Sequence, residues 1–433
     1  MLREAGIGLW LAWLVVSIIA SGMFFQLSTK TRVTVHQQAP GEPTPQRLWS
    51  VCFLLAPFAE SVTGFGVGYI IALGALQRLG ISGMTALQLG LFSQSLVPWG
   101  ALAVGTTVGA SLASIPVGQL GFYTALLQGP IHLLYLLIYW RILARANLAV
   151  PLTRKLDDLL WTALLIALLA LANAYTEVEI AGAAPTALLL AIRYWRDERP
   201  DRRMVMQTLR THAPYVALTL SLCVTRLFTP LRDFLRPLWA IRPFENQPAF
   251  APLYAAGFWL LLVGTLTIWR HGADLMPVAR QTLRAAWRSC GVTAAFLVMA
   301  QLYVGAGLAR QLAEALNALA GSAAVAGIPP FAAVAGFLTG SGAASNAMLM
   351  PMVIALAQGL GLSTAVLAAI QNSVCANLSM LSPIRVSMGI GVMKLATSGA
   401  TPTEGEIYRR SLPLALAPVL VGLGTIMLIS LLR

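Results

Sequence analysis

Long apolar stretches recur along the whole chain, and the charged residues gather in the short segments between them. A helix needs about 20 apolar residues to cross the roughly 30 Å hydrocarbon layer of a bilayer. The pattern predicts an all-α polytopic membrane protein. About ten transmembrane helices are expected, at residues 7–26, 84–113, 118–140, 157–174, 179–195, 213–228, 250–269, 290–309, 363–394 and 412–432.

Two further stretches, 48–77 and 328–358, are too long for one simple helix and are interrupted at their middles by Gly, Ser and Thr. Irregular backbone is tolerated at membrane depth only where it is buried in protein or lines a cavity. These stretches are therefore predicted to be re-entrant or broken helical hairpins.

The two interrupted stretches resemble each other. Thr63-Gly64-Phe65-Gly66 recurs as Thr339-Gly340-Ser341-Gly342, and Leu79-Gly80-Ile81-Ser82 is echoed by Leu360-Gly361-Leu362-Ser363. A Ser-Gln-Ser-Leu-Val-Pro segment at 93–98 then corresponds to Asn-Leu-Ser-Met-Leu-Ser-Pro at 377–383. Single matches of this kind also arise from small residues that serve helix packing, but three in the same order indicate an internal repeat.

The predicted organisation is a single integral membrane domain over residues 1–433. The first repeat covers about 48–140, the second about 328–432, and connecting helices fill 141–327. Seven predicted spans separate the two hairpins, an odd number, so the copies would have opposite orientation. Inverted repeats with paired broken helices are typical of secondary transporters, which bind substrate near the midplane where the repeats meet.

Composition agrees with this picture, since 58% of residues are hydrophobic, 10% are charged, and the mean hydropathy is +0.75. The net charge of +13 comes from Lys and Arg in short loops, at 141–155, 193–210 and 270–288, which fall on one side and predict a cytoplasmic face. Topology thus explains the basicity without nucleic acid, and the expected location is the inner cell membrane. Arginines between 226 and 242 fall on the opposite side, which indicates either an interfacial helix or one miscounted span.

The sequence contains no recognisable motif of a soluble enzyme. Four single cysteines lack metal or disulfide spacing, and no Walker, HExxH or Rossmann motif is present. We therefore predict no enzyme activity, no metal and no cofactor. We also predict a secondary rather than an ATP-driven transporter, although the sequence of one chain leaves a separate ATPase subunit open. The first apolar stretch lacks a convincing cleavage site and is expected to be retained as a helix.

Breaks in the helices supply the candidate binding groups. Half-helix N-termini expose N–H groups and a positive dipole end that favours an anion, and small residues let it approach. The alternative is that the hydroxyls only rebond carbonyls freed by the breaks. The candidate substrate-binding residues are Thr63, Gly64, Gly66, Ser93, Ser95, Thr339, Gly340, Ser341, Ser345, Asn346, Asn377, Ser382 and Arg385.

Glu60 is the only acidic residue deep in an apolar stretch before residue 150. A carboxylate there is costly unless it is neutralised or paired, so we expect it to exchange the coupling proton; alternatively it caps the next half-helix. Arg385, two residues after Pro383, matches a carboxylate substrate but could instead pair with Glu60. His132 could relay protons, or could be a hydrogen-bonded packing residue.

Three motifs resemble the L-lactate permease family. Residues 56–66, which contain Phe58, Glu60 and end in Gly-Phe-Gly, are similar to its first motif. Residues 337–341 with Ser345-Asn346-Ala347 resemble its second, FLTGS followed by SSNA, and 380–383 resemble its third, MISP. The resemblance implies a proton-coupled carrier of small 2-hydroxy monocarboxylates such as lactate, in a superfamily built on inverted hairpin repeats.

Three positions depart from the family pattern. Gly342 stands where the family usually has Asp, Ser379 where it has Lys, and Ile384 where it has Gln. These departures leave open the exact anion and whether a proton or sodium drives transport. The alternatives are an anion channel or an exporter of another small anion built on the same hairpins, and an intramembrane enzyme or scaffold. The expected partners are a small organic anion, the coupling ion and lipid. The sequence is also compatible with a homo-oligomer.

Overall fold

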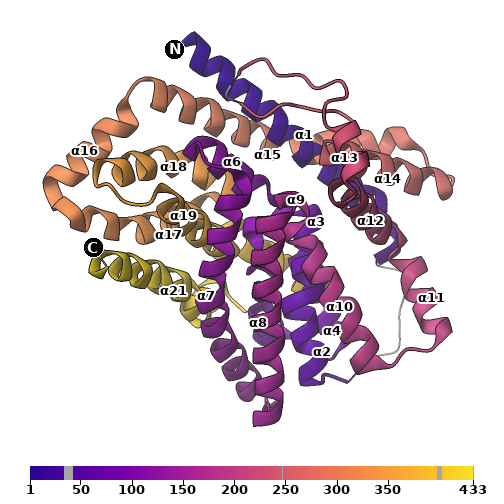
Figure 1. Ribbon diagram of the computed structural model, residues 1–433. Coiled ribbons are helices and arrows are strands. Elements are labelled where there is room, and N and C mark those ends of the chain that lie inside the picture. The colour runs from indigo at the N-terminus through magenta and orange to yellow at the C-terminus, as the bar shows by residue number, and fades with distance from the viewer. Residues whose placement is uncertain (34–41, 246, 397–401, 433) are drawn as a thin grey trace.

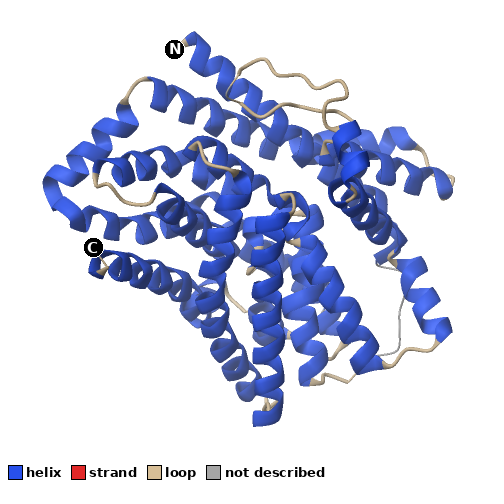
Figure 2. Ribbon diagram, viewed as in Figure 1, coloured by secondary structure: helices blue, strands red, loops and turns tan. Residues whose placement is uncertain are grey.

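The chain was analysed as a computed structural model, which describes residues 1–33, 42–245, 247–396 and 402–432. Over these residues the chain is almost entirely helical (Figure 2), and its one β-type contact is an isolated bridge between Ile241 and Phe250. The predicted all-α class is therefore confirmed.

Five helices of the described residues are 24 to 32 residues long. Their sequences are apolar over many turns, and internal prolines in two of them are tolerated because neighbouring groups in a membrane bundle take up the freed backbone bonds. α7 and α8 lie side by side, as do α1 and α15 (Figure 1). The five are α1 (Leu2–Val33), α7 (Val117–Arg145), α8 (Leu152–Tyr175), α15 (Leu275–Gly305) and α21 (Glu404–Leu431).

The two interrupted stretches both form broken helices, as the sequence predicted. The first region runs through α2 (Pro45–Ser50), a π-helical turn η1 (Val51–Leu55), α3 (Ala56–Thr63), α4 (Val67–Arg78), α5 (Gly83–Leu91), η2 (Phe92–Gln94), η3 (Val97–Trp99) and α6 (Gly100–Ala113). The second runs through α17 (Ile328–Thr339), α18 (Gly342–Gly359), α19 (Thr364–Leu378), η5 (Ser379–Leu381) and α20 (Pro383–Ala396).

Shorter helices connect these regions. Here the structure differs from the sequence expectation, because α15 begins at Leu275 and so carries most of the basic segment that was expected to be a loop. The connecting elements are α9 (Val178–Ala181), α10 (Ala183–Glu198), α11 (Arg202–Thr211), α12 (Ala213–Leu227), α13 (Thr229–Leu235), α14 (Ala256–Arg270), α16 (Leu308–Ala320) and η4 (Gly321–Gly327).

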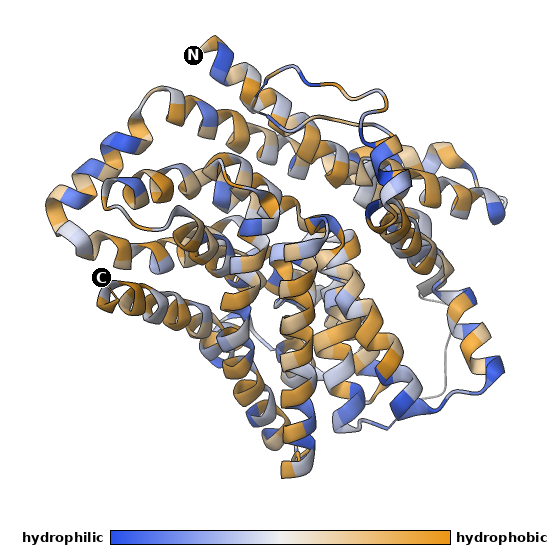
Figure 3. Ribbon diagram, viewed as in Figure 1, coloured by the Kyte–Doolittle hydropathy of each residue, from blue (hydrophilic) through white to orange (hydrophobic). Residues whose placement is uncertain are grey.

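Six spans in the described residues are long and apolar enough to cross a membrane, or up to eight if each of two bent pairs counts as one span. The sequence predicted about ten. It counted α10 and α14, which are shorter than a full crossing, and the end of α15, which is not among these spans, and it did not count the span over Leu308–Thr339. Hydrophobic residues occupy most turns of the long helices, while α11 mixes hydrophilic and hydrophobic residues (Figure 3). Large apolar side chains such as Leu420 and Met427 of α21 point outward, as in a helix that faces lipid.

The two broken regions pack directly on each other. α18 lies on α6, and α19 lies on α7. Gly105 of α6 permits the first contact, since a Cβ there would be 3.3 Å from the backbone of Ala343. Small residues at such crossings are the usual means of close helix packing in membranes.

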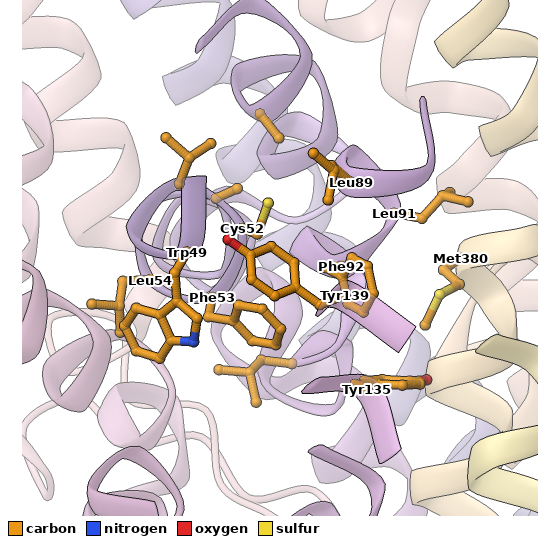
Figure 4. Close-up of a cluster of buried hydrophobic side chains, with 14 of the residues drawn as sticks. Trp49, Cys52, Phe53, Leu54, Leu89, Leu91, Phe92, Tyr135, Tyr139 and Met380 are labelled. Atoms are coloured by element: carbon orange, nitrogen blue, oxygen red, sulfur yellow. The ribbon is translucent and has the colours of Figure 1, made fainter. Parts of the chain in front are cut away.

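An aromatic cluster fills the interior beside the first broken region (Figure 4). Trp49 stacks on Phe53 at 5.5 Å between ring centroids, and Tyr139 meets Phe53 edge-on at 5.4 Å. Phe92 contacts Tyr135 edge-on at 5.8 Å. These pairs join η1, η2 and α7, so the π-helical turn that leads into α3 is held by rigid aromatic contacts.

The repeated Leu-Gly turns have the same geometry. Gly80 and Gly361 both adopt positive φ, of 76° and 62°. In each turn, the residue after the glycine donates its N–H to a carbonyl five residues earlier, at 2.9 and 2.8 Å. This is the Schellman arrangement that ends a helix at glycine.

Candidate functional site

The first break lies at Gly64-Phe65-Gly66, between α3 and α4. All three residues have positive φ, of 71°, 57° and 80°. Gly64 donates its N–H to the Glu60 carbonyl at 2.7 Å, which ends α3, and α4 starts after Gly66. Successive positive φ angles are accessible at low cost only to glycine, so the Gly-x-Gly sequence explains why the helix breaks here.

The Glu60 side chain fills this break. It is 1% exposed, and its two oxygens accept hydrogen bonds from the N–H groups of Gly66 at 3.1 Å and Gly68 at 3.0 Å. These amides are at the start of α4, where the helix dipole favours negative charge. Glu60 therefore caps the second half-helix of its own hairpin, the structural alternative raised by the sequence.

Arg385 of α20 completes the cluster. Its Nη1 lies 3.4 Å from Glu60 Oε1, and its side chain is 9% exposed. The contact uses a single N–H, whereas a guanidinium carries five. Of the two partners that the sequence allowed Arg385, the structure shows Glu60.

Close packing fixes this carboxylate. A Cβ on Gly68 would lie 2.8 Å from the Cβ of Glu60, and a Cβ on Gly100 would lie 3.8 Å from its Cγ. Next to Gly100, residues 101–103 form a left-handed turn, with φ of 51°, 56° and 62°. Non-glycine residues pay roughly 1–2 kcal/mol each in this conformation, so the surrounding packing must hold the turn in place.

The second break, between α17 and α18, is closed by hydroxyl groups. Gly340 has φ of 62°, and the Ser341 hydroxyl accepts the N–H of Ala344 at 3.3 Å as an N-cap. Thr339 Oγ1 lies 2.8 Å from Ser345 Oγ and also contacts the Ser341 backbone. These neutral groups occupy the position that the carboxylate occupies in the first break.

α20 links the two breaks. The Arg385 guanidinium contacts Glu60, while its backbone N–H donates to Ser382 Oγ at 3.4 Å. Ser382 in turn lies against Gly340, where a Cβ would be 2.8 Å from its hydroxyl oxygen. Met388, one turn further along α20, lies against Gly66. α20 and the residue that precedes it therefore touch the glycines of both breaks.

The contacts divide the predicted site residues into two sets. Those joined around α20 by the contacts above are Glu60, Gly64, Gly66, Thr339, Gly340, Ser341, Ser345, Ser382 and Arg385. The others bond elsewhere inside the protein, or have no partner, and are Thr63, Ser93, Ser95, Asn346 and Asn377.

Within the second set, Thr63 and Ser93 have local partners. Thr63 donates to the Ala59 carbonyl at 2.6 Å, which is the carbonyl rebonding raised as an alternative, and Ser93 accepts from Gln94 at 2.9 Å. Ser95 is fully buried and its hydroxyl has no partner among the described residues. Asn377 donates to the Ser373 carbonyl at 2.8 Å.

Asn346 belongs to a buried network that sequence reasoning missed. Its amide donates to the Gly105 carbonyl at 2.9 Å and to Asn372 Oδ1 at 2.8 Å. Asn372 then donates to Thr106 at 3.0 Å and Thr124 at 3.1 Å. The network ties α18 and α19 to α6 and α7, and only the high density of amides and hydroxyls in these apolar helices signals it.

His132 lies in the aromatic cluster rather than beside Glu60. Its ring is 6.3 Å from that of Phe53, and Nδ1 lies 2.8 Å from the Gln128 carbonyl. This is the environment of a hydrogen-bonded packing residue. Among the described residues, no group of three or more His, Cys, Asp or Glu side chains is placed to hold a metal ion.

The comparisons with known proteins agree with this architecture. The crystal structure of the Alcanivorax borkumensis YdaH transporter, reported to have an unusual topology, is similar at a TM-score of 0.50 over 98% of this chain and 84% of that one, with 14% identity. At that identity the likeness concerns the fold. No curated protein matches the sequence.

A family model described as L-lactate permease matches residues 242–432. This part includes the second broken region with Thr339, Ser382 and Arg385, while Glu60 lies outside it. The sequence had already indicated this family from motifs in both broken regions. The chain is a multi-pass membrane protein, and its part from residue 242 to 432 is similar to the L-lactate permease family.

Proposed function

We propose that this protein is a secondary active transporter of small organic anions, and that it carries lactate or a similar 2-hydroxy monocarboxylate together with a proton. The family match supports the class of solute. The observation that carries the mechanism is the buried pair of Glu60 and Arg385 at the first break. We place the protein in the inner cell membrane.

Charge balance explains how such a pair would couple the two fluxes. Glu60 and Arg385 neutralise each other inside an apolar bundle, where an unpaired charge is costly. An arriving carboxylate would compete with Glu60 for the guanidinium, whose planar fork suits a carboxylate. The site would then hold two negative charges and one positive charge. Protonation of Glu60 restores neutrality and releases Arg385, so anion and proton are favourable together and neither is favourable alone.

The second break would hold the rest of the solute. Thr339, Ser341, Ser345 and Ser382 present hydroxyls near Gly340, beside the same α20 that carries Arg385. Hydroxyl groups suit the 2-hydroxy substituent of such a solute because they both donate and accept hydrogen bonds. We further propose that 48–140 and 328–432 are inverted copies within one domain, and that their relative movement gives alternating access. The matched Leu-Gly turns support the repeat.

Uptake of labelled lactate into proteoliposomes under an imposed pH gradient tests this function. We expect lactate to accumulate and an uncoupler to abolish the accumulation. Glu60→Gln removes the carboxylate and Arg385→Ala removes the cation, so each should lower uphill uptake at least tenfold. Glu314→Gln is the matched control, because Glu314 forms an exposed pair with Arg310 at 3.5 Å, far outside the cluster.

Other outcomes would separate the alternatives. Downhill flux without accumulation would indicate an anion channel. Accumulation driven by sodium rather than protons, with full activity in Glu60→Gln, would overturn the role of Glu60. Failure of lactate alongside uptake of another small anion would retain the carrier and replace its substrate.

A further inference from the structure

A short segment between α8 and α10 covers the first break. We name residues 176–182, which include α9, the strap. Its Gly182 lies directly against Trp99, and a Cβ there would be 2.8 Å from the hydroxyl of Ser61. Its Ile180 packs in one buried cluster with Val62 and Leu102. The strap therefore contacts α3, η3 and α6 at the same place.

The groups beneath the strap adjoin the proposed proton site. Ser61 follows Glu60 in α3, and Gly100, next to Trp99, approaches the Glu60 side chain. Ala101, which begins the left-handed turn, is in contact with Gly64, since a Cβ on Gly64 would be 2.5 Å from its own. A single layer of residues thus separates the strap from Glu60.

A partly buried ion pair joins the strap to the rest of the bundle. Glu179 Oε2 accepts from Arg226 Nε at 2.9 Å and from Nη2 at 2.8 Å. Arg226 is fully buried, and it also donates to the Tyr254 carbonyl at 2.7 Å and lies over the Tyr254 ring. The arginine therefore joins three separate segments: the strap, α12 and the turn before α14.

Three arginines of this region, which the sequence placed on the unexpected side of the membrane, have acidic partners. Arg226 is neutralised by Glu179, Arg236 lies 3.9 Å from Glu177 at the outer end of the strap, and Arg232 pairs with the adjacent Asp233. Arg226 and Arg236 thus pair with residues of the strap, which the sequence pattern alone did not suggest.

We propose that the strap is a gate over Glu60, and that the Glu179–Arg226 ion pair holds the gate closed. This inference rests on the proposed function, because it concerns access to the same site. Opening requires the strap to leave Trp99 and Ser61, and therefore requires the ion pair to separate or to move as a unit with α12. The left-handed turn at 101–103 would be free to relax once Ile180 no longer packs on it.

The reactivity of a cysteine beneath the strap tests the gate without any transport assay. Cys52, Cys223, Cys290 and Cys375 are first replaced by serine, and Ser61→Cys is then introduced. A small methanethiosulfonate reagent should modify this thiol slowly. In the double variant Glu179→Leu with Arg226→Met, which removes the pair without leaving a buried charge, the rate should rise at least tenfold.

A matched control and a second variant keep the test decisive. Glu177→Gln removes only the long, exposed pair with Arg236 and should leave the rate unchanged. Ile180→Ala loosens the strap without altering any charge and should raise the rate of thiol modification several-fold. It therefore tests the gate even if the double variant does not fold. An unchanged rate in a folded, monodisperse double variant, or in Ile180→Ala, would overturn the gate.

The two proposals can fail separately. If modification responds as expected but no anion accumulates in any variant, the gate is retained and the proposed transport falls. If lactate accumulates with protons but the rate of modification does not respond, the gate alone falls.

Discussion

The two breaks share a backbone plan and differ in chemistry. At each, a glycine N–H ends the first half-helix by donating to a carbonyl four residues earlier, at 2.7 Å for Gly64 and 2.9 Å for Gly340. The second half-helix is then capped from nearby. Glu60, a buried carboxylate, caps it in the first region, and Ser341, a hydroxyl, caps it in the second.

Their glycines also differ. Gly64 has φ of 71° and ψ of −162°, a region that only glycine occupies readily. Gly340 has φ of 62° and ψ of 16°, the left-handed helical region that some other residues tolerate. The first break is thus the more constrained of the two.

The comparison teaches that a repeated scaffold need not carry repeated chemistry. The buried carboxylate lies at the first break, while the second region contributes neutral groups at its break and Arg385 from α20. The charge pair therefore spans the junction between the two regions rather than lying inside either one. We infer that the first region exchanges the proton and the second positions the solute.

Glu60→Leu should have the largest effect on stability. It leaves the Arg385 charge buried without its partner and leaves the α4 cap unmade, which should cost about 3–5 kcal/mol of unfolding free energy. Denaturation in detergent micelles measures this, and the double variant Glu60→Leu with Arg385→Met should regain much of the loss. A cost no greater than that of Ser341→Ala would remove the contrast between the breaks.

Replacing the glycines should show that the backbones of the two breaks are constrained to different degrees. Gly64→Ala forces an unfavourable φ/ψ and meets Ala101, so we expect a loss of about 3 kcal/mol. Gly340→Ala should cost about 1–2 kcal/mol, since the left-handed region is less restrictive and only the Ser382 hydroxyl has to move. The same denaturation measurement compares them, and equal losses would show that the first break is not the more constrained.

Ser341→Ala should have a modest effect. It removes the N-cap of α18, whose loss typically costs about 1 kcal/mol. Ser341→Asp, which can still cap, should retain the stability of the native protein. A loss comparable to that of Glu60→Leu would mean that the second break depends on its cap as strongly as the first.

Ser95→Ala should have the smallest effect, within about 0.5 kcal/mol. Its hydroxyl is buried and has no partner among the described residues, so its removal leaves no group unsatisfied. Ser93→Ala is the matched control and should cost about 1 kcal/mol, because Ser93 accepts from Gln94 at 2.9 Å. A clear loss of lactate uptake in Ser95→Ala at unchanged stability would instead place Ser95 in the solute path.

Local signals made most of the fold predictable. Apolar stretches gave the long helices, and Gly64-Phe65-Gly66 and Gly340 gave the breaks, because glycine determines where a left-handed turn is cheap. Hydropathy failed where a helix is not apolar. α15 extends through Arg280, Arg284 and Arg288, in a segment that was expected to be a loop.

Less of the candidate site could be predicted. Glu60 could be identified because it is an acidic residue in a broken apolar helix. The sequence left open whether Arg385 pairs with Glu60 or with a carboxylate substrate, and the fold showed the pair with Glu60. The left-handed turn at 101–103 contains no glycine and so carries no local signal. The Glu179–Arg226 pair and the Asn372 network join residues far apart in the chain, and one sequence does not reveal such distances.

The Glu179–Arg226 pair also has a consequence for biosynthesis. The two residues are 47 positions apart, so Glu179 leaves the ribosome first and Arg226 emerges as an unpaired charge. That arginine counts in the charge bias that orients helices during membrane insertion. We expect the α8–α10 segment to be in place before α12 settles, so that the order of synthesis, and not hydropathy alone, decides which way this part of the protein faces.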